Sequence, residues 1–250
     1  MFGRVAAFFI WKTSVTNSVH GILFEVCRKT KVTRETIFSK IVSRVTFAPM
    51  FTEQQEKWLN RITELFMRLG IKSLTMDDVA RELGISKKTL YQFVENKDDL
   101  VKKAITLHLT AECGRSVELS SMAIDALDEM LIVIKENTGD MQRMKANIVF
   151  ELQKYHRDAW ELLQDYQRGF LYKVVRDNLE RGIREGYYRD DFDVDITAKL
   201  HLVQTFAIFD DTWFPKPPYS GETLFKEAMM LYLQSILSEK GRQAIKAKLS

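Results

Sequence analysis

Cysteine, proline and glycine are all scarce in this 250-residue chain, which contains two Cys, four Pro and 11 Gly. Cys27 and Cys113 lie far apart in the sequence, and neither belongs to a CxxC pair. We therefore expect a reducing compartment and no disulfide framework. Because Pro and Gly mark the turns between strands, their shortage argues against an all-β fold and favours an all-α one.

Long apolar runs are also missing from the chain. The stretch Val5–Trp11 is apolar but only seven residues long, whereas a membrane span needs about 20 apolar residues. It also lacks the small-x-small cleavage site of a secretory signal. Together with a mean hydropathy of −0.20, these features argue against a membrane protein and predict a cytoplasmic location.

The net charge of +3 hides an uneven distribution along the chain. Residues 1–50 contain eight Lys and Arg but only two Glu, so this segment has a surplus of six positive charges. The rest of the chain therefore has a net charge of −3. Overall charge does not support nucleic-acid binding, and any such function must rest on a local cluster of residues.

From residue 51 onward, apolar residues recur at intervals of three and four, which predicts a succession of helices. The first is expected to stop at Gly70. Three short helices should follow within residues 75–112, because Thr75, Ser86 and Asn96 are good N-caps. Longer helices are predicted at residues 116–137, 140–154, 157–185, 193–213 and 221–238, and a charged tail ends the chain.

The segment 76–93 has the spacing of two helices joined by a tight turn. Ala80 is small enough for the helices to cross beside it, and Gly84 tolerates the positive φ that the turn needs. The apolar residues expected to face the joint are Val79, Leu83, Ile85, Leu90 and Phe93. This is the helix-turn-helix spacing, in which the second helix enters the DNA major groove and presents its N-terminal residues to base edges.

The polar residues of the second helix suit DNA contact. With Ser86 as N-cap, Lys87, Lys88 and Thr89 occupy the first turn and point outward. A helix N-terminus favours anions, Lys can bond to guanine, and the Thr methyl group can contact thymine. Lys also contacts phosphates, so the sequence leaves open whether these lysines read bases or only position the helix. An ordinary solvated basic turn is the alternative.

The stretch LTMDDVARELGISKKTLYQFVENKDDLVKKAI resembles the DNA-binding domain of the TetR family of transcriptional regulators. The matching positions are Thr75, Val79, Ala80, Gly84, Ile85, Ser86, Leu90, Tyr91, Lys97 and Leu100. Two positions depart from the family pattern and stay apolar: Phe93 replaces a frequent Tyr, and Val94 replaces the usual Phe. The resemblance implies that Thr75, Tyr91 and Lys97 contact phosphates. The residues that it places toward the groove are Lys87, Lys88, Thr89 and Gln92.

We divide the chain into three parts. Residues 1–49 are expected to be a poorly ordered or non-native extension, with a basic arm that touches DNA phosphates as the alternative. Residues 50–112 form the three-helix domain with the helix-turn-helix. Residues 113–250 form a larger helical domain, which the resemblance implies is used for ligand binding and dimerisation.

Large apolar and aromatic side chains are frequent after residue 113, where they would usually form a core. In a long helical body they can also line an apolar cavity for a small-molecule effector, as in the resembling family. The residues that we expect to line it are Phe150, Tyr155, Tyr166 and Phe170. Nothing in the sequence identifies the effector.

The segments 193–213 and 221–238 are apolar on more than one face, which predicts two packing partners for each. One face should pack on the core and the other on a second subunit, which gives a two-fold homodimer. The expected interface residues are Leu202, Phe206, Phe209, Leu224, Ala228, Leu231 and Tyr232. Such a dimer would place two recognition helices about one DNA turn apart on a palindromic operator. A monomer whose terminal helices pack only internally is the alternative.

Sequence signatures of catalysis and metal binding are missing. The chain has no GxSxG, P-loop, GxGxxG or HExxH motif, and its four His are scattered. We therefore expect no catalytic residue, no cofactor and no metal site. The predicted function is a repressor that a small apolar ligand releases from double-stranded DNA. The alternative is an architectural DNA-binding protein without a ligand, and a helical enzyme is the least favoured class. Ligand-dependent release from DNA distinguishes the first two.

Overall fold

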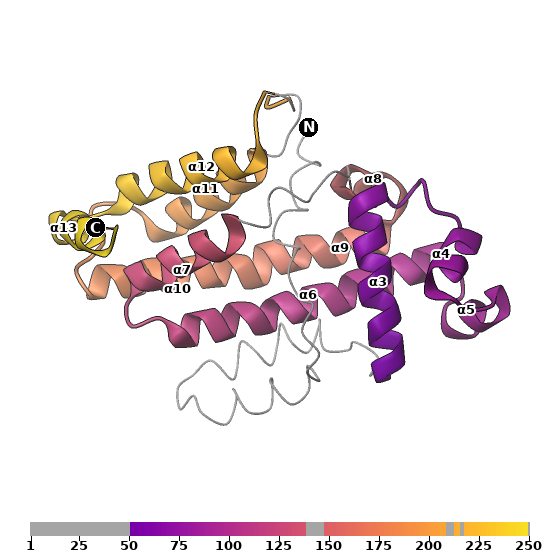
Figure 1. Cartoon of the computed structure of the whole chain (residues 1–250). Coiled ribbons are helices and arrows are strands. Elements are labelled where there is room, and N and C mark those ends of the chain that lie inside the picture. Colours follow the sequence, from indigo (N-terminus) through magenta and orange to yellow (C-terminus); the bar gives the residue numbers. More distant parts are fainter. Residues whose placement is uncertain (1–50, 139–147, 209–212, 216–217, 250) are drawn as a thin grey trace. The chain divides into compact units, whose positions relative to one another are not determined.

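The computed structural model describes residues 51–138, 148–208, 213–215 and 218–249, most of which lie in helices (Figure 1). The helices are α3 (Glu53–Leu69), α4 (Met76–Leu83), α5 (Lys87–Phe93), α6 (Lys97–Met122), α7 (Ala126–Thr138), α8 (Ile148–Tyr155), α9 (Arg157–Asp165), α10 (Tyr172–Arg184), α11 (Val194–Ala207), α12 (Gly221–Ile236) and α13 (Glu239–Leu249). A π-helical stretch, η2 (Tyr166–Leu171), lies between α9 and α10. The described ranges contain no β-strand beyond an isolated bridge, and the predicted all-α fold is confirmed.

The chain divides into two compact units. The described part of the first consists of residues 51–115 and 148–166, and therefore holds α3, α4, α5, the larger part of α6, α8 and α9. Its core side chains come from the apolar stripe of α3 and from α4, α5 and α6, and include Leu59, Ile62, Leu65, Phe66, Val79, Leu90 and Leu100. Burial of such a stripe, at intervals of three and four residues, stabilises short helices that would be marginal alone.

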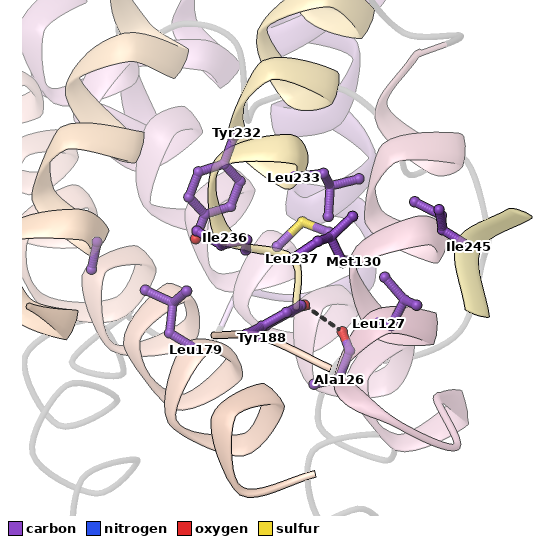
Figure 2. Close-up of a cluster of buried hydrophobic side chains, with 11 residues drawn as sticks. Ala126, Leu127, Met130, Leu179, Tyr188, Tyr232, Leu233, Ile236, Leu237 and Ile245 are labelled. Atoms are coloured by element: carbon purple, nitrogen blue, oxygen red, sulfur yellow. Dashed lines mark hydrogen bonds between the residues drawn. The ribbon is translucent and has the colours of Figure 1, made fainter. Parts of the chain in front are cut away.

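The second unit contains α7, α10, α11, α12 and α13. Figure 2 shows its core, in which aliphatic side chains from several of these helices surround Tyr188. The Tyr188 hydroxyl donates a hydrogen bond of 3.1 Å to the carbonyl oxygen of Ala126, at the start of α7. The amide of Asn178 on α10 lies 3.0 Å from each of these two oxygen atoms. A buried polar network therefore ties α7 to α10 within this otherwise apolar core.

The prediction that a short helix follows Asn96 and ends by residue 112 is wrong about the length of this helix. Helix α6 passes residue 112 without interruption and ends at Met122. The next helix begins at Ala126, because the side chain of Asp125 accepts a hydrogen bond of 2.6 Å from the backbone N–H of Asp128 and so acts as an N-cap. The single helix predicted over residues 116–137 is therefore two helices separated by a short turn.

The charged C-terminal tail is also a helix, α13, rather than an extended segment. Lys248 near its end lies 3.2 Å from a carboxylate oxygen of Asp128 and 3.7 Å from one of Asp125. Ile245 on the same helix is buried in the core of the second unit. The carboxylates that bind Lys248 thus come from the start of α7 and the residue before it, more than 100 residues earlier in the chain.

The predicted domain boundary at residues 112 and 113 lies inside α6 and assigns α8 and α9 to the C-terminal domain. The first compact unit instead includes α8 and α9, whose side chains Leu152, Ala159 and Leu163 are buried. The predicted extension at residues 1–49 lies outside the described residues, as do residues 140–147 of the helix predicted over residues 140–154. The helix predicted over residues 193–213 is described as α11 up to Ala207.

Candidate nucleic-acid interface

Helices α4 and α5 meet at a tight turn whose geometry follows from two capping residues. The side-chain oxygen of Thr75 accepts a hydrogen bond of 3.2 Å from the N–H of Asp78, while the Asp78 carboxylate accepts one of 3.0 Å from the N–H of Thr75. This reciprocal capping box starts α4. Gly84 ends it in the left-handed conformation, with φ of 66° and ψ of 30°, a region where other residues are strained. The chain can therefore turn sharply into α5.

Helix α5 has one buried side and one exposed side. Ser86 caps it by accepting a hydrogen bond of 3.0 Å from the N–H of Thr89. Leu90 is fully buried, and Val94 just after the helix is buried as well. The ring of Phe93 lies 6.1 Å from the ring of Trp58 on α3, measured between centroids. These contacts fix α5 against α3, so the opposite side of α5 faces solvent.

The residues predicted to face the groove lie on this exposed side. Lys87, Lys88, Tyr91 and Gln92 are exposed, and Thr89 is half-buried. The Lys87 ammonium lies 2.9 Å from a carboxylate oxygen of Asp77 on α4, and this hydrogen bond raises the pKa of Lys87. No ion pair to Lys88 is found among the described residues. Lys88 is therefore the lysine of α5 whose charge is available to a ligand.

Lys97, which is expected to contact a DNA phosphate, also binds the backbone of the protein. Its Nζ atom donates a hydrogen bond of 2.5 Å to the carbonyl oxygen of Leu74, and its side chain is half-buried. Burial lowers the pKa of Lys97, while the nearby charge of Glu151 acts in the opposite direction. One of the three ammonium donors of Lys97 thus holds the connection between α3 and α4. The sequence suggested only the outward role.

Two residues that the sequence did not single out link α8 and α9 to this part of the protein. The carboxylate of Glu151 on α8 accepts hydrogen bonds from the backbone N–H groups of Ile71 and Lys72, at 2.6 and 2.9 Å. Nδ1 of His156, between α8 and α9, lies 2.6 Å from a carboxylate oxygen of Asp98 at the start of α6. All of these residues belong to the first compact unit. No local pattern could reveal these contacts, because the partners are 58 to 80 residues apart.

The predicted dimer residues of the second unit are mostly buried within the chain itself. Leu202, Phe206, Ala228 and Tyr232 are buried, and Leu224 is half-buried. Phe209 lies outside the described residues. Leu231 is 59% exposed. Helix α11 instead exposes three large apolar side chains on another side, those of Ile196, Leu200 and Val203.

The predicted effector-pocket residues fall in both compact units. Phe150, Tyr155 and Tyr166 belong to the first, and Phe170 belongs to the second. Tyr166 and Phe170 are buried, whereas Tyr155 is 43% exposed. The Nζ atoms of Lys72 and Lys154 lie 5.5 and 5.2 Å from the centre of the Tyr155 ring. That these four residues line a pocket stays a prediction.

Within the described ranges, no three His, Cys, Asp or Glu side chains gather closely enough to hold a metal ion. None of the helices described is both long enough and apolar enough to cross a membrane.

Comparison with known proteins identifies the first unit. Residues 59–104 match the sequence model of the family described as "Bacterial regulatory proteins, tetR family". These residues include α4, α5 and the start of α6. The match therefore covers the capping box, the Gly84 turn and the exposed side of α5.

Similarity to individual proteins extends over more of the chain. The HTH-type transcriptional repressor KstR2 of Mycolicibacterium smegmatis is 23% identical over 201 residues, which cover 75% of this chain and 93% of that protein. Among solved structures, a TetR-family regulator from Agrobacterium tumefaciens has a TM-score of 0.63 at 17% identity, over 74% of this chain and 98% of that one. FadR of Bacillus subtilis, solved in complex with stearoyl-CoA, has a TM-score of 0.56 at 14% identity, over 72% of this chain and 98% of that one. Residues 59–104 are therefore identified as a DNA-binding domain of the tetR family of bacterial regulatory proteins, in a chain whose similar curated proteins include an HTH-type transcriptional repressor.

Proposed function

We propose that this protein represses transcription by binding an operator of two inverted half-sites as a homodimer, with α5 of each subunit in the major groove. The observation that carries the proposal is the two-sided character of α5. Leu90 holds one side of the helix in the core, while Lys88 and Gln92 stand exposed on the other side. An anchored helix with exposed polar residues near its N-terminus is what groove recognition requires.

The exposed residues divide into two proposed roles. Lys88 and Gln92 read base edges, since Lys can bond to guanine and Gln can bond to adenine through two hydrogen bonds. Thr75 and Tyr91 are assigned to phosphate contact. Thr75 is exposed at the start of α4, and Tyr91 is exposed on α5. Lys87 must leave Asp77, 2.9 Å away, before it can bind DNA. We therefore assign Lys87 a smaller share of the affinity than Lys88.

Replacing Lys88 tests this division. We expect Lys88→Ala to change the base preference at one position in each half-site and to weaken operator binding by roughly 1–3 kcal/mol. Lys226→Ala is a matched control, because Lys226 is exposed on α12 and pairs with Glu222. An unchanged preference profile with lower affinity for all sequences would assign Lys88 to phosphate contact, and unchanged affinity would remove α5 from the interface.

We also propose that a second copy of the chain covers the exposed apolar residues of α11 and α12. Ile196, Leu200 and Val203 recur at intervals of three and four on α11, and Leu231 is exposed on α12. Solvated stripes of this kind favour association, and a two-fold interface uses the same patch on both subunits. These exposed residues take the place of four residues that the sequence assigned to the dimer interface and whose side chains are buried in the chain: Leu202, Phe206, Ala228 and Tyr232.

The effector is proposed to bind in the second unit and to carry an uncharged hydrogen-bonding group. Nδ1 of His201, Oγ1 of Thr205 and the hydroxyl of Tyr232 are buried, and none has a hydrogen-bond partner among the described residues. The His201 and Tyr232 rings stack with their centroids 3.7 Å apart. Burial lowers the pKa of His201 to about 3, so the imidazole is neutral at neutral pH. Buried polar atoms without partners are costly, and a hydroxyl or carbonyl group of a ligand would satisfy them.

One protein of similar fold supports an apolar part of the ligand, since FadR of Bacillus subtilis was solved with stearoyl-CoA, which contains a long acyl chain. The test is thermal stabilisation by decan-1-ol, decan-2-one, decanoate and decylamine, with the Thr205→Val/Tyr232→Phe double variant as comparison. We expect the alcohol or ketone to stabilise the wild type more than the double variant. Equal stabilisation of both proteins, or stabilisation only by the charged probes, would contradict the assignment.

A further inference from the structure

The connection between α3 and α4, residues 70–74, determines where the helix-turn-helix begins. It leads directly to Thr75, the N-cap of α4. Its first residue, Gly70, caps α3 with φ of 85°, and its N–H donates to the carbonyl oxygen of Phe66. The side chains of Ile71 and Leu74 are buried. The connection is therefore packed at both ends, and a change in its backbone would move the start of α4.

A single carboxylate oxygen binds two consecutive N–H groups of this connection. Oε2 of Glu151 lies 2.6 Å from the nitrogen of Ile71 and 2.9 Å from that of Lys72. Hydrogen bonds to an ionised acceptor are stronger than those between neutral groups. Successive backbone N–H groups that converge on one anion form an arrangement known from anion-binding loops. Here the anion is a side chain from α8, nearly 80 residues later in the sequence.

The backbone at Gly70 is fitted to the carboxylate. A Cβ atom at this position would lie 3.3 Å from Oε1 of Glu151, which is closer than most Cβ contacts, and 3.5 Å from Oε2, which is an ordinary contact. The positive φ of Gly70 also disfavours other residues. The positive φ therefore favours glycine at this position, and a Cβ would also require the Glu151 carboxylate to shift by a few tenths of an ångström.

The other end of the connection is held from α6. Nζ of Lys97 donates to the carbonyl oxygen of Leu74 at 2.5 Å. Burial lowers the pKa of the Lys97 ammonium group, while the charge of Glu151 acts in the opposite direction. The connection is thus bound at its start by an anion that accepts from N–H groups and at its end by a cation that donates to a carbonyl group. Both partners match the polarity of the backbone groups that they bind.

From these contacts we infer that Glu151 is a positioning residue for operator binding, which acts by holding the α3–α4 connection and with it the angle of α4 and α5. The inference rests on the proposed DNA-binding function. Residues 59–104, which match the family model, do not include Glu151. The DNA-binding helices of this chain therefore depend on a carboxylate supplied from α8.

The test is Glu151→Gln, which keeps the size of the side chain and removes its charge. Glu161→Gln is the matched control, since Glu161 on α9 is exposed and pairs only with Arg157 in the described ranges. Affinities for the operator and for random DNA are measured over a range of salt concentrations. We expect Glu151→Gln to weaken operator binding roughly tenfold, to affect random DNA much less and to leave the salt dependence unchanged, because Glu151 contacts no phosphate. Glu161→Gln should match the wild type.

Two further measurements separate positioning from misfolding. Hydrogen exchange at the amides of Ile71 and Lys72 should accelerate in Glu151→Gln, while amides in the core of α6 keep their protection. Glu151→Asp retains the charge but shortens the side chain, and it should show the same loss of operator preference. Wild-type operator affinity in Glu151→Gln would overturn the inference and leave the proposed function intact. So would an equal loss on operator and random DNA together with global loss of protection. A wild-type protein that binds no DNA would overturn both.

Discussion

Leu90 and Lys88 are two residues apart on α5, yet the first is fully buried and the second is exposed. Their different environments follow from the helical period, because residues two apart point to opposite sides of a helix. The same local reasoning identified Ser86 as the cap and Gly84 as the turn, and both are found in those roles. It could not reveal that Lys97 also binds the carbonyl group of Leu74, 23 residues earlier. That Lys97 contacts phosphate stays a prediction.

Gly84→Ala should be destabilising through backbone strain alone. The φ of Gly84 is 66°, and no atom lies within 4 Å of the position that a Cβ would take. The expected cost is about 1–2 kcal/mol of the free energy of unfolding, measured by denaturant titration. Gly114→Ala is the control, because Gly114 lies within helix α6 with equally open surroundings. That substitution should increase stability by up to about 1 kcal/mol. Equal effects of the two substitutions would refute the role of the left-handed turn.

His201 should make the protein sensitive to acid. Burial lowers its pKa from 6.5 to about 3 in the folded state, so below pH 6.5 the unfolded chain binds a proton that the folded protein does not. The contribution of a neutral His201 to stability is fully present above pH 6.5 and decreases as the pH falls toward 3. The free energy of unfolding should decrease by about 1.4 kcal/mol per pH unit on this account.

His201→Phe keeps a ring against Tyr232 but cannot bind a proton. Between pH 6 and pH 4, its free energy of unfolding should therefore fall less steeply than that of the wild type, by about 1.4 kcal/mol per pH unit. Urea denaturation at several pH values measures both slopes. Parallel slopes for the two proteins would show that His201 is protonated in the folded state as well.

At the scale of elements, helices with a local start signal were predicted best. Helices α4 and α5 begin at Thr75 and Ser86, whose side chains cap them, and α12 begins after Ser220 in the same way. The length of α6 and the helical state of α13 were not predicted. Helix α6 continues through Gly114, a residue type that often ends helices. Helix α13 is held in part by Asp125 and Asp128, more than 100 residues earlier. Glu151 was missed for the same reason, because its partners are distant in sequence.

Ser86→Ala should weaken DNA binding by loosening the first turn of α5. Ser86 accepts from the N–H of Thr89 at 3.0 Å, and Ser220 accepts from that of Thr223 at 3.1 Å. Loss of either cap should lower the free energy of unfolding by about 1 kcal/mol. Only Ser86→Ala should also lower operator affinity, since α12 contacts no DNA in the proposed complex and Ser220 lies 11 residues before Leu231, the exposed residue of α12 in the proposed dimer contact. A similar loss of operator affinity in Ser220→Ala would show that general destabilisation is the cause.

At the scale of the whole molecule, the proposed two-fold dimer would connect the exposed apolar side chains of α11 to DNA recognition. Leu200 is 63% exposed in the single chain, which favours its burial against a second copy. We expect Leu200→Glu to shift the protein from dimer to monomer in sedimentation experiments, because two carboxylates would meet near the two-fold axis. Met122→Glu is the control, as Met122 is 64% exposed at the end of α6. A dimeric Leu200→Glu protein would place the interface elsewhere.

Selection of bound sequences from a pool of random double-stranded DNA tests directly whether α5 reads DNA in a homodimer. We expect enrichment of two inverted half-sites whose centres lie about one helical turn, roughly 10 base pairs, or a multiple of it apart. Lys88→Ala should change the enriched base at the same position of both half-sites. Enrichment of a single unpaired motif would contradict the dimer. No enrichment at all would contradict sequence recognition by α5.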